Sequence, residues 1–202
     1  MPMKSDPSFR SPDPFSTETP RVAESSALAN DVELLRKAAA GDGRAFHLLV
    51  DRHAQRMYRL AVSLVGNATD AEDVVQEAFA GAFRGLSGFE GRAAVKTWLT
   101  RILFTQAAKW RRDRSRRVMG SMDAAEQPMV GGGDESVGIK IDLNAALLQL
   151  SPEHREVLLL REFEGMAYKE MAEVLGVPRG TIESRLHRAR NELREKLASY
   201  GV

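Results

Sequence analysis

The chain has 202 residues with 29 Lys and Arg against 28 Asp and Glu, so its net charge by itself indicates no class of partner. This length suffices for one large or two small domains with modest hydrophobic cores. The absence of cysteine excludes disulfides, thiolate metal sites and cysteine nucleophiles. No apolar run approaches the roughly 20 residues that span a bilayer, and no apolar segment follows Lys4 and Arg10 as in a secretion signal. We therefore expect a cytoplasmic protein without membrane insertion.

The first part of the chain is predicted to be a disordered tail followed by two helices. Residues 1–27 hold five prolines among Ser, Thr and Asp, and such a segment buries too little apolar area to offset the entropy of ordering. Val32, Leu35 and Ala39 then share one face of a short helix that ends at Gly41. A long amphipathic helix follows, with apolar positions at steps of three and four residues: Phe46, Leu49, Val50, His53, Met57, Leu60 and Leu64.

A third and a fourth helix carry opposite charges. Thr69 with Glu72 three residues later is typical of a capping box, so the third helix is expected to begin near Asp70. Its predicted buried stripe is Val74, Val75, Ala78, Phe79, Ala82, Phe83 and Leu86. The fourth helix runs from about Ala94 into a basic cluster that is opposed only by Asp113. Clustered cations of this kind attract phosphates. The cluster comprises Arg101, Lys109, Arg111, Arg112, Arg114, Arg116 and Arg117.

Residues 118–138 separate this region from a second helical one. They lack periodicity and include three consecutive glycines, which is typical of a flexible linker. Ser151 followed by Pro152 predicts a helix N-cap with proline at the first helical position. The predicted helices cover 153–163, 168–175 and 178–198. The predicted fold is thus all-α, with two small helical domains at 28–117 and 139–202.

The last two helices have the spacing of a helix-turn-helix. Ala172 is small enough for two helices to cross closely, and Gly176 can take the positive φ that the tight turn needs. Val177, Ile182 and Leu186 would hold the second helix against the first. In this geometry the second helix enters a DNA major groove. The alternative is an ordinary helical hairpin with a solvated basic face.

Several outward positions of this second helix are candidates for contact with base edges or phosphates. Glu183 could accept a hydrogen bond from cytosine N4, but its charge repels phosphates. His187 is either a base reader or an ordinary surface histidine. The candidate set is Arg179, Thr181, Glu183, Ser184, Arg185, His187, Arg188 and Arg190.

Two sets of motifs, in this order along the chain, resemble one known family. They are the stretch Asp-Ala-Glu-Asp-Val-Val-Gln-Glu-Ala-Phe at 70–79, Phe-Glu-Gly at 89–91 with Trp-Leu-Thr-Arg-Ile at 98–102, the arginines after Trp110, and Leu-Ser-Pro-Glu-His-Arg-Glu-Val-Leu at 150–158 with the helix-turn-helix. The chain is similar, over roughly 30–117 and 140–198, to the bacterial RNA polymerase sigma factors of the extracytoplasmic-function (ECF) group.

This resemblance implies two partners, core RNA polymerase and promoter DNA. In the family, the positions of Asp70, Asp73, Gln76 and Phe79 dock on the polymerase clamp. The positions of Lys96, Arg101, Lys109, Arg111 and Arg112 follow DNA around the start site, and Trp98 there is either a core residue or a base-stacking one. The loop at 88–94 would receive an unstacked base. The C-terminal domain would read the upstream promoter element.

Two positions depart from the family pattern. Val95 stands where many members carry an aromatic residue, and Thr105 stands near the place of an asparagine. Asparagine reads adenine well and threonine does so less specifically, so the downstream sequence recognised by this chain is expected to differ.

The resulting prediction is a sigma factor without catalysis, cofactor or metal. Its four histidines, at 47, 53, 154 and 187, are not at metal-ligand spacings, and no phosphate loop or nucleophile motif is present. Two alternatives stay open: a helix-turn-helix regulator that never joins polymerase, and a sigma-like decoy that binds an anti-sigma factor. Members of the family are often held inactive by an anti-sigma factor, which makes it a further candidate partner.

Overall fold

The structure, a computed structural model, describes residues 20–91, 93–120 and 137–199, and every regular element in those ranges is helical. The front half contains α1 (Pro20–Ala39), α2 (Gly43–Val65), α3 (Ala68–Arg84), the 3₁₀ turn η1 (Leu86–Gly88) and α4 (Val95–Gly120). The back half contains α5 (Val137–Leu148), α6 (Pro152–Leu158), the π-helical turn η2 (Leu159–Phe163), α7 (Tyr168–Leu175) and α8 (Arg179–Ser199). The prediction of an all-α fold is confirmed.

The first helix is longer than expected and is turned differently. α1 begins at Pro20, so residues 20–27 are helical and not part of a disordered tail; proline is well tolerated at the first helical position. Residues 1–19 lie outside the described residues. Val32 is exposed and not buried as predicted. The reason is that Asp31 turns inward instead, where its carboxylate bonds with His53 at 2.9 Å and with Arg52.

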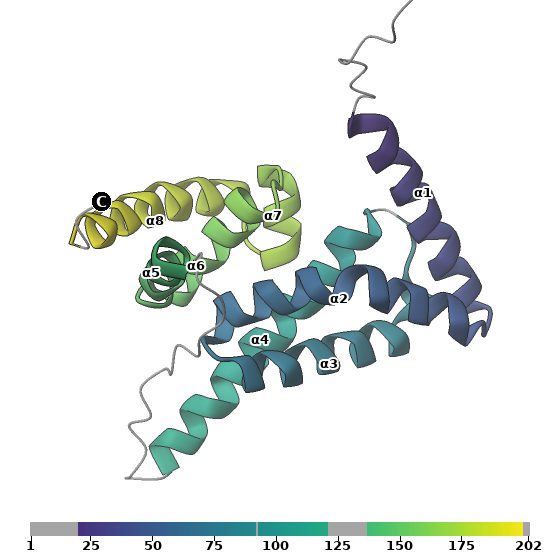
Figure 1. The fold of residues 1–202 in the computed structure, drawn as a ribbon, viewed down its shortest axis with the longest axis horizontal. Helices are drawn as coiled ribbons and strands as arrows, with labels where there is room; N and C mark the ends of the chain where they lie inside the picture. The colour runs from purple at the N-terminus through teal and green to yellow at the C-terminus, as the bar shows by residue number, and fades with distance from the viewer. Residues whose placement is uncertain (1–19, 92, 121–136, 200–202) are drawn as a thin grey trace, which may run out of the picture.

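α2 is the amphipathic helix at the centre of the front half (Figure 1). Asp42 caps it by accepting hydrogen bonds from the backbone N–H groups of Arg44 and Ala45. Gly66 ends it at a φ of 94°, a conformation that only glycine adopts without steric cost. Its inward face matches the predicted periodicity, with Leu49, His53, Met57, Leu60 and Leu64 all buried.

α3 begins two residues earlier than the capping-box pattern predicted. Its N-cap is Asn67, whose side-chain oxygen accepts a hydrogen bond from the Asp70 N–H at 2.8 Å. Asn67 is extended directly after the left-handed Gly66, so it can cap the helix before Thr69 is reached. On the inward stripe Phe79 is buried, whereas Phe83 is 55% exposed and packs edge-on against Phe46 at 5.1 Å.

α4 is buried in its first half and charged in its second. Val95, Leu99, Leu103, Phe104 and Ala107 are all buried. Val95 is 1% exposed, so the aliphatic residue at this family-aromatic position belongs to the core. Beyond Ala107 the helix continues to Gly120 and carries the basic cluster past the end of the core.

The back half confirms the helix-turn-helix. The Ser151 hydroxyl caps α6 by accepting from the His154 N–H at 3.3 Å. The predicted helix at 153–163 is continuous, but its last turn is the π-helical η2. Gly176 ends α7 at a φ of 66°, with its N–H bonded to the Ala172 carbonyl, as the tight turn requires. Ile182, Leu186 and Ala189 bury the inner face of α8.

The two halves are in contact. α4 packs against α7, and α2 packs against α5 and α6 (Figure 1). The buried apolar residues of both halves form one continuous cluster. Most of the predicted linker, residues 121–136, lies outside the described residues.

Candidate nucleic-acid and protein-binding surfaces

The outer face of α3 is the candidate protein-binding surface. Asp73 and Gln76 are exposed on it, and Asp70 is half-buried at its N-terminal end, 3.6 Å from Arg114. Phe79 is 8% exposed, so its side chain belongs mainly to the core, and its contact with polymerase stays a prediction. Its position in the helix places it with Val74, Ala78 and Ala82 in the core.

The exposed aromatic residue on this helix is Phe83. It lies seven residues after Gln76, nearly two full helical turns, so these two side chains share one face of α3. Sequence reasoning assigned Phe83 to the core. The signal that could have found it is this seven-residue spacing from the polar Gln76.

On α4 the predicted DNA-contacting cations divide into two groups. The side chains of Arg101, Lys109 and Arg112 are exposed, with no hydrogen bond or ion pair to another described residue. Lys96 and Arg111, in contrast, bond with carboxylates of the back half. The hydroxyl of Thr105 donates to the Arg101 carbonyl one turn earlier at 2.8 Å. Only the first group is therefore free to contact phosphates in this arrangement.

Trp98 forms one wall of a hollow beside the loop at 88–93. Its ring packs against Phe89 with the ring centres 5.2 Å apart, and it is half-buried. The hollow measures about 250 Å³. Arg101 reaches it from α4, and Glu173 with Val174 reaches it from α7. Trp98 is thus both a packing residue and an aromatic wall.

The candidate DNA-contacting residues on α8 differ in their exposure and in whether they pair with another side chain. Ser184, His187 and Arg188 are exposed at the outermost part of the helix, and Thr181 and Arg185 are half-buried at its flank. The other three candidates, Arg179, Glu183 and Arg190, are paired. Glu183 accepts from Arg179 at 2.8 Å, which offsets the charge that would repel phosphates.

Arg190 is paired with Glu162 of η2 at 2.7 Å, and this hydrogen bond raises the pKa of Arg190 above its ordinary value. Both side chains are about half exposed, so the pair contributes little to stability.

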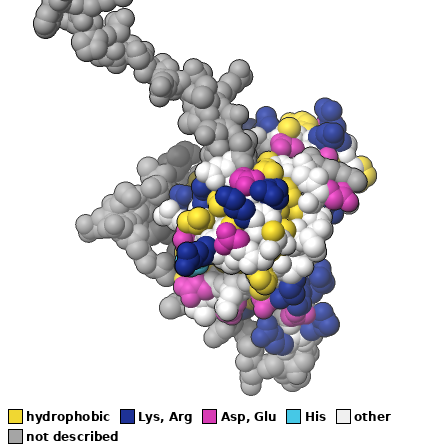
Figure 2. All heavy atoms as spheres, turned by 90° about the vertical axis from the view of Figure 1, so that its right-hand side faces the viewer, with side chains coloured by type: hydrophobic (Ala, Val, Ile, Leu, Met, Phe, Trp, Pro, Cys, Tyr) yellow, Lys and Arg dark blue, Asp and Glu magenta, His cyan; other side chains and the backbone are white. Residues whose placement is uncertain are grey.

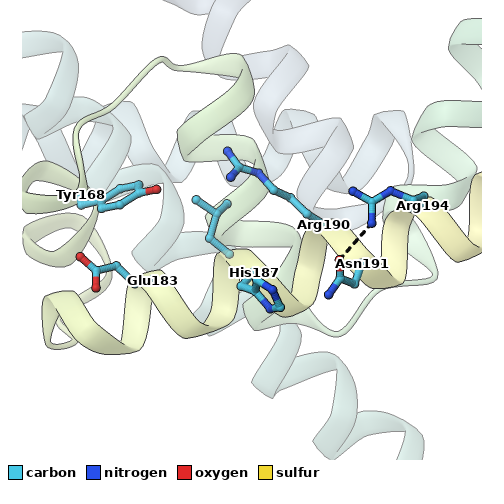
Figure 3. A pocket seen from close by; sticks show the side chains of 7 residues that line it. Tyr168, Glu183, His187, Arg190, Asn191 and Arg194 are labelled. Atoms are coloured by element: carbon cyan, nitrogen blue, oxygen red, sulfur yellow. Dashed lines mark hydrogen bonds between the residues drawn. The ribbon is translucent and has the colours of Figure 1, made fainter.

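A second hollow, of about 370 Å³, runs along α8 beside Tyr168 (Figure 3). His187, Arg190 and Arg194 stand along α8 on this side, with Asn191 bonded to Arg194 at 3.1 Å. Sequence reasoning missed Asn191 and Arg194, although they follow His187 at helical spacing. Their position extends the polar face of α8 by one turn.

Tyr168 lies under two guanidinium groups. Arg161 and Arg179 stand 5.3 and 5.9 Å from the centre of its ring. Such cation–π contacts contribute about 0.5–1 kcal/mol at exposed sites. They fix Arg179, at the first position of α8, relative to α7.

No described helix has the length and apolarity needed to cross a membrane. Within the described ranges no cluster of three His, Asp or Glu side chains is placed to hold a metal ion. On the face drawn in Figure 2, basic, acidic and apolar side chains are interspersed. That face therefore carries no single-sign charge.

Taken together, these surfaces define a bipartite helical DNA-binding protein, with a helix-turn-helix in one half and an acidic and a basic helix in the other. Residues 49–117 match the family model for sigma-70 region 2, and residues 140–193 match the model for sigma-70, region 4. The chain is 36% identical to the RNA polymerase sigma-H factor of Pseudomonas aeruginosa, over 83% of this chain and 93% of that one. It is 34% identical to the ECF RNA polymerase sigma-E factor of Escherichia coli strain K12, over 85% and 96%. The chain belongs to the ECF group of RNA polymerase sigma factors.

Solved structures agree with this assignment. The sigma factor RpoE of Bartonella quintana, in complex with the anti-sigma factor NepR, has a TM-score of 0.64 and 31% identity, over 76% of this chain and 96% of that one. CnrH in complex with the cytosolic domain of CnrY has a TM-score of 0.63 and 30% identity, over 84% and 98%. The chain is thus a sigma factor in sequence and in fold, and its partners are core RNA polymerase and promoter DNA.

Proposed function

We propose that this sigma factor divides its work between a front domain at 28–117 and a back domain at 139–202, joined by a linker at 118–138. The outer face of α3 docks on core polymerase through Asp73, Gln76 and Phe83, with Asp70 at its edge. The exposed acids at the N-terminal part of α3 support this role, because they offer a basic partner a complementary charge. The helix dipole also favours acids there, which is compatible with docking.

The front domain also holds the downstream promoter element. Arg101, Lys109 and Arg112 contact phosphates, and the hollow beside Trp98 receives one unstacked base. Extrusion of a base costs on the order of a few kcal/mol. Stacking on an aromatic side chain contributes about 1–3 kcal/mol per base, so one stacked base with a few phosphate contacts offsets that cost.

The back domain reads the upstream element through α8. Ser184, His187 and Arg188 are exposed on it, and a good bidentate contact with a base contributes about 1–3 kcal/mol of discrimination. We expect Arg188→Ala to relax sequence selection in the upstream element by roughly 10- to 100-fold while the salt dependence changes little. Equal weakening on every sequence would contradict a base-reading role for Arg188.

Two domains that each bind DNA weakly bind it more tightly when they are on one chain, because the second contact is intramolecular once the first has formed. In this proposal the chain performs no catalysis and acts in the cytoplasm, where polymerase and promoter meet. The observation that supports it best is the presence of both family regions in order, each with its candidate surface exposed.

Transcription in vitro tests the whole proposal. Purified chain and core polymerase are combined with a library of random promoters, and initiation at specific sequences is expected. The matched pair Asp73→Arg and Asp51→Arg separates docking from general charge effects, since both carboxylates are exposed. Asp73→Arg should abolish binding to core polymerase, and Asp51→Arg should not.

The same experiment separates the alternatives. A regulator outside polymerase would bind promoter DNA without directing initiation, and a decoy would bind neither core polymerase nor DNA. Retained polymerase binding by Asp73→Arg would exclude the docking surface on α3.

A second proposed partner is an anti-sigma factor. The support is that the similar Bartonella quintana protein was solved with one. If such a partner exists, the chain isolated from its native host should carry a second protein in equal amount. Its removal should restore transcription with core polymerase; transcription that is already full before removal would argue against it.

A further inference from the structure

The back half lies on the front-half surface that we assign to the downstream element. α7 packs against α4, and Figure 1 shows it beside the first part of that helix. Glu173 and Val174 of α7 line the same hollow as Trp98 and Arg101. A DNA strand that follows α4 into this hollow would meet α7. In this arrangement, the packing of α7 on α4 and the binding of DNA in this hollow therefore exclude each other.

One carboxylate joins the halves at this place. Glu164 follows η2 in the back half, and its side chain is only 3% exposed. It accepts a hydrogen bond from Arg56 of α2 at 2.6 Å and lies 3.2 Å from the ammonium group of Lys96 of α4. Arg56 also donates to the Thr100 hydroxyl at 3.0 Å. Glu164 thus ties α7 to two front-half helices, and it occupies Lys96, one of the predicted DNA-contacting residues.

Two other polar contacts cross the same interface. Arg155 donates to the carbonyl of Leu64, at the end of α2, at 2.8 Å, and also to three carbonyls around the end of α5. Arg111 of α4 donates to Glu156 of α6 at 2.6 Å. Charges, and not apolar side chains alone, therefore hold the halves together.

Such a contact is separable. Burial lowers the pKa of Arg56 and of Arg155 and raises the pKa of Glu156, which means that each charged form loses solvation there. The Nε and one terminal nitrogen of Arg56 are buried without a hydrogen-bond partner among the described residues. Buried ion pairs return little net free energy because desolvation offsets their attraction. Opening returns these groups to water.

We propose that this sigma factor closes on itself, with Glu164 as the latch that keeps α7 over the downstream-element surface until core polymerase or DNA opens the chain. The proposal rests on the proposed function for the part that concerns DNA. The latch explains why a carboxylate is buried between two cations far from it in sequence. It also makes Arg56 a latch residue without a DNA contact of its own.

Distances between spin labels in the full free chain test the closure. The sequence lacks cysteine, so labels can be placed at Glu77→Cys on α3 and Glu195→Cys on α8, both exposed. The parent should give one narrow distance. Glu164→Gln should raise the ratio of open to closed molecules at least about tenfold, since removal of one partner leaves a buried charge unpaired. The matched control Glu162→Gln, which breaks only the exposed pair with Arg190 in the same half, should leave the distance unchanged.

A broad, long distance in the parent, or an unchanged distance in Glu164→Gln with helical content intact by circular dichroism, would overturn the latch. Binding of labelled single-stranded DNA of random sequence is the second readout. Glu164→Gln should bind it at least about fivefold more tightly, and Arg101→Ala in the same chain should remove that gain. Opening without any gain in DNA binding would leave the closure standing and overturn the assignment of this surface to the downstream element.

Discussion

The contact of α2 with α3 and the contact between the two halves differ in the buried charges that only the second one contains among the residues named here. α2 and α3 meet through apolar side chains, among them Met57 and Val74, which are buried with no polar atom to satisfy. The halves also share buried apolar side chains, but their contact includes Glu164, Arg155 and Arg111, whose charges are bonded across the boundary.

This difference separates a permanent contact from a reversible one. Separation of α2 from α3 would expose apolar area at a free-energy cost of about 25 cal/mol per Å². Contact with water does not offset this cost. The charged groups between the halves recover solvation on opening, which offsets part of the cost of exposing the apolar side chains at that boundary. A protein that must bind polymerase and two DNA elements needs a permanent contact inside its front half and a reversible contact between its halves.

Met57→Ala should have the largest effect on this comparison. Met57 is fully buried in α2, and its truncation should lower the free energy of unfolding by about 2–5 kcal/mol. Urea denaturation of the full chain measures this loss. Gln55→Ala, at an exposed neighbouring position of the same helix, should cost less than about 0.5 kcal/mol. Equal costs for the two variants would contradict an apolar, permanent α2–α3 contact.

Arg155→Met should have an intermediate effect, on the contact between the halves and on the packing of α5 against α6. The variant keeps the length of the side chain but leaves four carbonyl groups without their donor. A loss of about 1–3 kcal/mol is expected. Amide hydrogen exchange should speed up in α5 and at the end of α2 and stay unchanged in α3. Arg194→Met, on the exposed face of α8, serves as the control, and faster exchange throughout α3 would show that the contact is not separable.

His53 sharpens the comparison because it is a buried polar group inside the front half. Burial lowers the pKa of His53 below its ordinary value, despite the opposing effect of Asp31. Between the unfolded pKa of about 6.5 and the lowered folded pKa, the unfolded chain binds a proton that the folded chain does not. The contribution of His53 to the free energy of unfolding is therefore full above pH 6.5 and declines as the pH falls below that value.

We expect the free energy of unfolding to drop by about 1 kcal/mol from pH 7 to pH 5.5 through His53. His53→Gln, which keeps a donor for Asp31, should flatten this dependence while costing about 1 kcal/mol at pH 7. His47→Gln, at an exposed position of the same helix, should keep the slope of the parent. A slope that survives in His53→Gln would assign the effect to another group.

Local signals in the sequence predicted most helices and several of their ends. The caps at Ser151 and Gly176 agree with the structure, because a cap depends on side chains and φ angles within a few residues. The start of α3 was wrong by two residues because Asn67 and Thr69 are both good caps, and the left-handed Gly66 selects the first.

The errors in predicting which residues are buried are explained by contacts between helices. Periodicity placed Val32 and Phe83 inside, whereas the structure buries the charged Asp31 and leaves Phe83 half exposed. Asp31 is buried because His53 and Arg52 of α2 meet it. No pattern within α1 or α3 contains that information, since a partner on another helix decides which flank turns inward.

The sequence by itself determined the family, the helices and the basic and acidic faces, because helix periodicity, caps and motifs are local properties of the chain. Only the tertiary structure decided that Lys96 and Arg111 are occupied while Arg101 and Arg112 are free. Their carboxylate partners stand in the other half, with Glu164 separated from Arg56 by 108 residues. A charge becomes a latch or a DNA contact according to what the fold places beside it.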